Sequence, residues 1–182
     1  MGNLTNKVKK KKARQKKAKF VSLFVISAAI AFFHATSTIY LRQLFNVKTL
    51  LPAGDIPKTD TIFNVGDLMV LKYEMGLKIL NDKSFLLAEQ IRPGAILLLL
   101  LVVIYMVGKE KLDRLGLFLY ISGLFSVAYY AILYGFLGWP DSLLAKDVVS
   151  FLPVPIIVPV YMPVLLSLLV FMVGFFLVFK KK

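Results

Sequence analysis

Long apolar runs alternate with short charged segments along this chain, and this pattern predicts membrane-spanning helices. About 20 apolar residues, at 1.5 Å per residue, cross the hydrocarbon of a bilayer. Such runs predict a basic tail at residues 1–19 followed by a four-helix membrane domain at residues 20–182. Its spans are expected at about 20–41, 93–108, 115–138 and 157–179. The second run is the shortest, and it gains length if its helix begins further back, from Phe85.

The segment between the first two spans, residues 42–92, is predicted to be the one sizeable loop outside the membrane. Its first part is rich in Gly, Pro, Asp and Asn, which favour turns. Apolar residues then return at helical spacing behind a capping residue, Asp67, and they are Leu68, Leu71, Met75 and Ile79. The predicted fold class is therefore all-α, a four-span transmembrane helical bundle with a short amphipathic helix in the extracytoplasmic loop.

The connection from Trp139 to Ser150 precedes the last span, and its pattern predicts a second, shorter amphipathic helix. Asp141 follows a proline and is placed to cap it. Leu143, Leu144 and Val148 would form the apolar face. Lys146 and Asp147 are expected to face water or lipid headgroups.

Four prolines mark the start of the last span, in the run FLPVPIIVPVYMPVLL at 151–166. Proline lacks a backbone N–H and crowds the carbonyl four residues back, so Pro159 and Pro163 would leave the carbonyls of Pro155 and Pro159 unbonded in a continuous helix. We expect residues 151–158 to be extended. Two interpretations stay open: a rigid kinked start to the helix, or a transporter-like break that offers carbonyls to an ion or a substrate.

Composition places the chain among integral membrane proteins, because 58% of its residues are hydrophobic and its mean hydropathy is +0.75. The absence of cysteine excludes disulfides and thiolate metal sites. The net charge of +13 comes mainly from the ends of the chain, with nine of the 23 basic residues before Phe20. This charge predicts contact with anionic lipid headgroups rather than with nucleic acid.

The basic tail itself is expected to stay disordered until it meets an anionic surface. Its block of consecutive lysines is the predicted headgroup contact: Lys9, Lys10, Lys11 and Lys12. A tail that docks on RNA or on a ribosome is the alternative reading of the same block.

Charge counts predict the orientation of the bundle. Four spans place residues 1–19, 109–114 and 180–182 on one side, with 15 basic and two acidic residues. The other side, residues 42–92 and 139–152, has eight of each. By the positive-inside rule, we expect a multi-pass protein of the cell membrane with both termini in the cytoplasm.

The only histidine of the chain, His34, lies in the first span beside a stripe of small residues, Ser27, Ala31 and Ala35. Small residues at this spacing predict close packing inside the bundle, as do Gly116, Gly123, Ser126, Ala131 and Gly135 in the third span. An ionisable residue at membrane depth is a functional candidate. The alternative is a neutral histidine bonded to a neighbouring carbonyl or tyrosine hydroxyl.

Deep tyrosines of the third span need hydroxyl partners within the bundle, or they stack on an aromatic ligand. The candidate ligand-binding set at the outer mouth is therefore His34, Tyr129, Tyr130, Pro155 and Pro159. Haem would need a second axial ligand beside His34, so no cofactor is expected.

The C-terminal pattern, GWP at 138–140 followed by DVVSFLPVPIIVPVYMPVLL from Asp147, resembles a signature of small bacterial integral membrane proteins of unknown function. The resemblance covers the last two spans. It implies a membrane protein and carries no activity or site residues.

No metal cluster, nucleotide-binding loop, nucleophile elbow or carboxylate pair stands out in the sequence, so we expect neither catalytic residues nor a metal site. The leading hypothesis is a non-enzymatic accessory or assembly component that packs against a larger membrane protein complex. The alternative is a small-molecule or ion binding or transport module, with its site at the outer mouth near the proline-broken last helix. An enzyme that acts on lipid is a third possibility.

Overall fold

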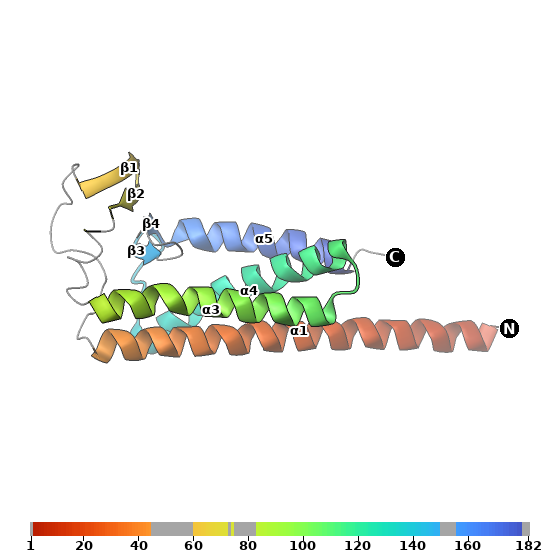
Figure 1. The fold of residues 1–182 in the computed structure, drawn as a ribbon. Helices are drawn as coiled ribbons and strands as arrows, with labels where there is room; N and C mark the ends of the chain where they lie inside the picture. The colour runs from red at the N-terminus through yellow and green to blue at the C-terminus, as the bar shows by residue number, and fades with distance from the viewer. Residues whose placement is uncertain (1, 45–59, 73, 75–82, 150–155, 180–182) are drawn as a thin grey trace.

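The computed structural model describes residues 2–44, 60–72, 74, 83–149 and 156–179. Helices that run side by side make up most of this part of the chain (Figure 1). They are α1 (Gly2–Leu44), α3 (Lys83–Val107), α4 (Lys111–Leu137) and α5 (Tyr161–Phe179). Three apolar segments are long enough to cross a membrane, within α1 at Lys17–Leu41 and over the whole of α4 and α5. The apolar part of α3, Ile91–Val107, is shorter.

Helix α1 begins at Gly2, so the structure shows a helix where we expected a disordered tail. Lysine, arginine, glutamine and alanine are good helix formers, and extending a helix that the apolar half has already nucleated is easy. This basic part of α1 projects beyond the other helices, at the end of the bundle where the chain also ends (Figure 1).

Close packing between α4 and α5 depends on glycine. A Cβ at Gly123 would lie 2.5 Å from the backbone nitrogen of Phe171, and one at Gly174 would run into the backbone nitrogen of Tyr120. The two backbones are therefore too close for a larger residue at either position. The small residues of α1 are used in the same way, because Ser27, Ala31 and Ala35 are fully buried. This confirms the predicted packing of these faces, whereas Ala131 and Gly135 are exposed.

A small sheet lies at one end of the bundle, so the fold is not purely α-helical (Figure 1). Its strands are β1 (Thr61–Val65), β2 (Leu68–Leu71), β3 (Lys146–Val149) and β4 (Ile156–Pro159). They are antiparallel in the order β1-β2-β4-β3. Strand β2 pairs with β4 through Met69 opposite Ile157 and Val70 opposite Ile156. The two connections at this end of the bundle, far apart in sequence, thus form one structure.

The amphipathic helix predicted from Asp67 is wrong for its first residues, 68–71, whereas Glu74 is helical. Leu68 and Leu71 lie in strand β2, and Gly66 has a φ of +59°, which suits the two-residue turn between β1 and β2. The apolar residues 68–71 are consecutive, so they do not lie along one face of a helix. Their strand instead pairs with β1 on one side and β4 on the other. Met75 and Ile79 lie outside the described residues.

The short helix predicted after Asp141 is also wrong, because that segment forms a turn and then strand β3. The backbone N–H of Val160 donates to the carbonyl of Ala145 at 2.9 Å, and that of Tyr161 donates to the carbonyl of Leu143 at 2.8 Å. The turn is thus held by the start of α5 instead of by bonds within a helix.

The extended approach to the last span is confirmed for the residues of β4, but α5 begins at Tyr161, later than the predicted 157. Pro163 falls in the first turn of α5, where a helix N–H has no internal partner and a proline is tolerated. The second span differs too. Helix α3 begins at Lys83 and contains Pro93 in its interior, so the longer of the two predicted starts is correct.

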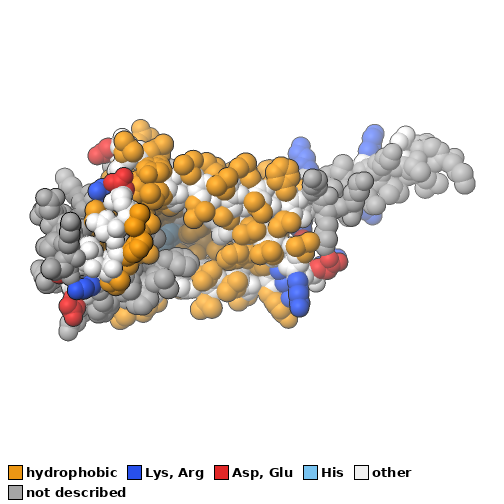
Figure 2. Space-filling model, turned by 90° about the horizontal axis from the view of Figure 1, so that it is seen from above, with side chains coloured by type: hydrophobic (Ala, Val, Ile, Leu, Met, Phe, Trp, Pro, Cys, Tyr) orange, Lys and Arg blue, Asp and Glu red, His pale blue; other side chains and the backbone are white. Residues whose placement is uncertain are grey.

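Hydrophobic side chains cover the middle of the bundle surface, and charged side chains gather toward its two ends (Figure 2). Many large apolar residues of the helices are exposed, including Phe33, Leu98, Met106 and Phe176. A surface of this kind is stable in lipid and unfavourable in water.

We expect Gly174→Ala to lower the free energy of unfolding by about 1–3 kcal/mol, because the added methyl group meets the α4 backbone. Thermal unfolding of the purified protein in detergent measures this effect. Gly135→Ala is the matched control. A Cβ at Gly135 meets no atom within 4 Å, so alanine should leave stability unchanged or raise it by up to about 1 kcal/mol. Equal midpoints for the two variants would contradict the close approach of α4 and α5.

Candidate functional site

The candidate site lies inside the bundle, near the end that carries the sheet. His34 is ten residues before the end of α1 and Tyr129 is eight residues before the end of α4. Both therefore lie about 12–15 Å in from these helix ends. Their rings stack with centroids 4.7 Å apart, and the ring of Phe125 lies 5.4 Å from that of His34. The Nδ1 atom of His34 is buried and has no hydrogen-bond partner among the described residues.

Thr38 connects the histidine to the tyrosine hydroxyl. It lies one helical turn after His34, is fully buried, and donates its hydroxyl to the His34 carbonyl at 2.9 Å. Its Oγ1 is also 3.4 Å from the hydroxyl oxygen of Tyr129. The tyrosine thus presents its ring to His34 and its hydroxyl to Thr38. The contact between His34 and Tyr129 is therefore one between their rings, which are tilted by 34°.

Tyr130 links this region to the sheet. It is 8% exposed, and its hydroxyl donates to a carboxylate oxygen of Asp147 at 3.1 Å. The other carboxylate oxygen accepts the backbone N–H of Val148 at 2.9 Å. The rings of Tyr129 and Tyr130 lie 5.2 Å apart, at an angle of 72°. A continuous series of contacts therefore runs from His34 to Asp147, and we call these residues the outer cluster: His34, Thr38, Tyr129, Tyr130 and Asp147.

Thr38 and Asp147 are the members of the outer cluster that were not among the predicted site residues. We expected Asp147 to face water beside Lys146, but it is 6% exposed. In a strand, neighbouring side chains point to opposite faces. Lys146 accordingly lies on the outside, with its Nζ 3.8 Å from a carboxylate oxygen of Asp67, while Asp147 turns toward α4. The strand pattern of KDVV, with its β-branched residues, is the signal that could have indicated this.

Arg92 adds positive charge at the same depth. It lies nine residues into α3, about 14 Å from the start of that helix, and its charge acts on His34. Its Nε and Nη1 atoms are shielded from solvent. Arg92 precedes Pro93 in the interior of α3, so it lies within the helix rather than at its start.

The other predicted site residues lie apart from the outer cluster or outside the described residues. Pro159 is buried in strand β4, opposite Lys146 of β3, and so belongs to the sheet. Pro155 lies outside the described residues. Lys10 and Lys11 are exposed on the projecting part of α1, and the side chains of Lys9 and Lys12 are not described.

A groove of about 350 Å³ opens beside Tyr130, between the end of α4 and the start of α5. Tyr134, Asp141 and Ser142 supply polar groups to its wall, and Val160 and other apolar residues supply the rest. The groove therefore lies next to the outer cluster, with Tyr130 forming part of its wall. No group of three or more His, Asp or Glu side chains that could hold a metal ion occurs in the described part of the chain.

Comparison with protein-family models, with curated proteins and with solved structures finds no match for this chain. The resemblance of its C-terminal pattern to small bacterial membrane proteins therefore stays a prediction.

The bond between Tyr130 and Asp147 is expected to stabilise the junction of helix and sheet. Buried hydrogen bonds to a charged group contribute about 1.5–3 kcal/mol. A double-mutant cycle with Tyr130→Phe and Asp147→Ala, followed by chemical unfolding in detergent, should give a coupling energy of about 1–3 kcal/mol. Asp141→Ala is the control, because Asp141 is an exposed acid in the same connection. A coupling energy near zero, or an equal loss with Asp141→Ala, would refute this role.

Proposed function

We propose that this chain is a four-span integral membrane protein of the cell membrane with both termini in the cytoplasm. Three helices meet the length and hydropathy needed for a span, and α3 runs beside them (Figure 1). The sheet and the projecting basic helix are at opposite ends of the bundle (Figure 1). This arrangement agrees with the charge counts, because the basic segments 1–19 and 109–114 are at the end away from the sheet. The anionic cytoplasmic leaflet would attract these segments.

Within the membrane, we propose that the protein binds a small molecule at the outer cluster and catalyses no reaction. The observation that carries this proposal is the buried Nδ1 atom of His34. The ring of His34 lies against that of Tyr129, and the charge of Arg92 acts on it. Ionisable groups at this depth are rare in membrane helices and usually serve a ligand or a transport path.

The chemistry of the cluster suits a small molecule that has an aromatic or planar part and hydrogen-bond acceptors. Rings of Phe125 and Tyr129 offer faces for stacking. Arg92 offers positive charge near His34. The groove beside Tyr130 opens next to one member of the outer cluster. A carboxylate or a quinone-like carbonyl compound has these properties.

An accessory or assembly role is the second candidate. Most small-residue faces are already used within the chain, since Gly123 and Gly174 join α4 to α5. Ala131 and Gly135 are the exception, because both are exposed at four-residue spacing on α4. This spacing allows close approach of another transmembrane helix, so it favours a partner within a larger membrane complex.

The binding proposal is tested by replacing His34 and asking what the purified protein retains. We expect protein extracted from its native membrane to carry a discrete small molecule, detected by mass spectrometry after denaturation. His34→Ala should reduce the retained amount at least about tenfold, which corresponds to about 1.4 kcal/mol of lost binding. Phe33→Ala is the control, because Phe33 is adjacent but 77% exposed toward lipid. It should retain the molecule fully.

Equal retention by both variants would contradict binding at the outer cluster. A stoichiometric protein partner that is retained with or without His34, and lost when Gly135 is replaced by Leu, would support the accessory role instead.

A further inference from the structure

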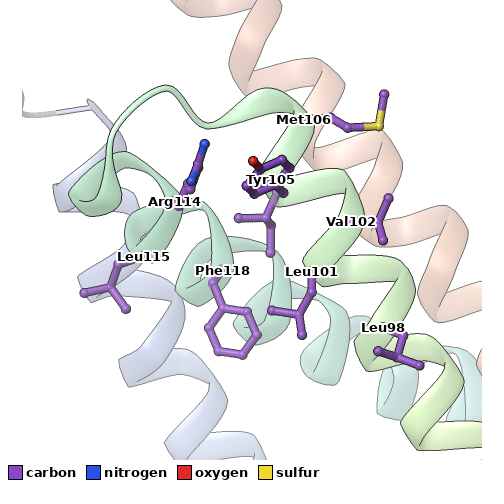
Figure 3. Close-up of a pocket in the computed structure, with 9 residues that line it drawn as sticks. Leu98, Leu101, Val102, Tyr105, Met106, Arg114, Leu115 and Phe118 are labelled. Carbon is purple, nitrogen blue, oxygen red and sulfur yellow. The ribbon is translucent and has the colours of Figure 1, made fainter.

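A second groove lies between α3 and α4, near the end of the bundle away from the sheet (Figure 3). Its volume is about 550 Å³. Leu98 and Leu101 of α3 and Phe118 of α4 form apolar walls, and Arg114 lies toward the end where the chain turns from α3 into α4 (Figure 3). Leu98 is seven residues from Tyr105, so the apolar wall extends about 10 Å along α3.

Arg114 is held in place at this end of the groove. Its Nε donates to the carbonyl of Gly108 at 2.9 Å, and its guanidinium carbon lies 4.3 Å from the centre of the Tyr105 ring. A Cβ at Gly108 would run into the Arg114 side chain, so this glycine makes room for the arginine. A guanidinium has five N–H donors, and the bond to Gly108 uses one of them. Its position is therefore fixed while donors remain for a ligand.

The charge at this site is positive. Among the described residues that line the groove, Arg114 is the one charged residue and none is acidic. The adjacent acid, Asp113, makes an ion pair with Lys19 at 3.3 Å and accepts the backbone N–H of Lys109 at 3.3 Å. Its charge is thus directed to other partners, and the groove offers a cation above an apolar channel.

We propose that this groove holds one anionic phospholipid, with its phosphate on Arg114 and an acyl chain along Leu98, Leu101 and Phe118. Arginine is suited to phosphate because its planar group donates two parallel hydrogen bonds. The groove faces the membrane, where Tyr105 and Met106 are largely exposed. The bilayer supplies an amphiphile with the required negative head and apolar tail. A transmembrane helix of a partner would fill the channel but leave Arg114 without an anion.

This site is independent of the outer cluster, which lies toward the opposite end of the bundle. Its test uses the full-length protein in nanodiscs that contain phosphatidylglycerol and phosphatidylcholine in equal amounts, followed by native mass spectrometry of the bound lipid. We expect one phosphatidylglycerol to be retained in preference to phosphatidylcholine. Arg114→Gln should reduce that preference about fivefold, which is the factor for roughly one basic group at an anionic surface.

Two further variants test the apolar channel with matched chemistry. Leu101→Phe places a larger side chain in the groove and should reduce the retention of both lipids. Leu99→Phe is the control, because Leu99 is 51% exposed on the same helix and does not line the groove. It should retain lipid as the unchanged protein does.

An unchanged lipid preference in Arg114→Gln would overturn the proposal. So would equal lipid retention by Leu101→Phe and Leu99→Phe, or a partner helix that crosslinks at Met106 in place of lipid. If Arg114→Gln does not fold, the question is decided by the Leu101 and Leu99 variants and by lipid retention of the unchanged protein at low and high salt. High salt should weaken retention of phosphatidylglycerol and leave that of phosphatidylcholine unchanged.

Discussion

The backbone of strand β4 needs hydrogen-bond partners from other parts of the chain. The whole sheet at the end of the bundle is built around this strand, which lies between β2 and β3. The prolines around it exclude a helix, and an unpaired backbone near lipid would cost several kcal/mol. Strands β2 and β3 supply the partners, with Met69 opposite Ile157 and Val148 opposite Ile157 on its two sides. This pairing joins the two connections at the sheet end of the bundle. It also fixes β3 against the end of α4, and so brings Asp147 to Tyr130.

The helices were predictable because their signals are local. Length and hydropathy indicated the spans, and small residues such as Ala31 and Gly123 correctly indicated faces that pack inside the bundle. Each of these inferences needed only the composition of one segment and the 1.5 Å rise of a helix. His34 and Tyr129 were both candidate site residues for the same mouth of the bundle, and their ring centroids lie 4.7 Å apart.

The sheet was not predictable in the same way, because its pairs join residues 68–71 to residues 156–159. Four consecutive apolar residues fit a strand or part of a helix equally well, and the periodicity favoured the wrong choice. Asp147 was missed for the same reason, since its burial follows from the strand alternation of β3. The candidate site residues on the helices, His34, Tyr129 and Tyr130, were thus predicted, and the residue that the sheet contributes, Asp147, was not.

The two ends of the bundle differ in chemistry, and each proposed binding site uses the chemistry of its own end. The end with the sheet has an acid, two tyrosines and a histidine in a series of contacts. The opposite end has basic residues and an apolar groove. The first arrangement suits a small polar ligand, and the second suits the anionic face of a membrane. Both depend on α4, which packs on α1 and α5 and contributes residues to each site.

Strands β2 and β4 join the two connections at the sheet end of the bundle, and the rest of the sheet depends on this pairing. An engineered disulfide between the two strands tests the pairing most directly. The chain has no cysteine, so paired substitutions can be read without interference. Met69→Cys with Ile157→Cys places thiols on partner positions and should give an intramolecular disulfide on mild oxidation. Met69→Cys with Val148→Cys should not, because β4 lies between these strands. No disulfide in the first pair, or equal yields in both, would contradict the shared sheet.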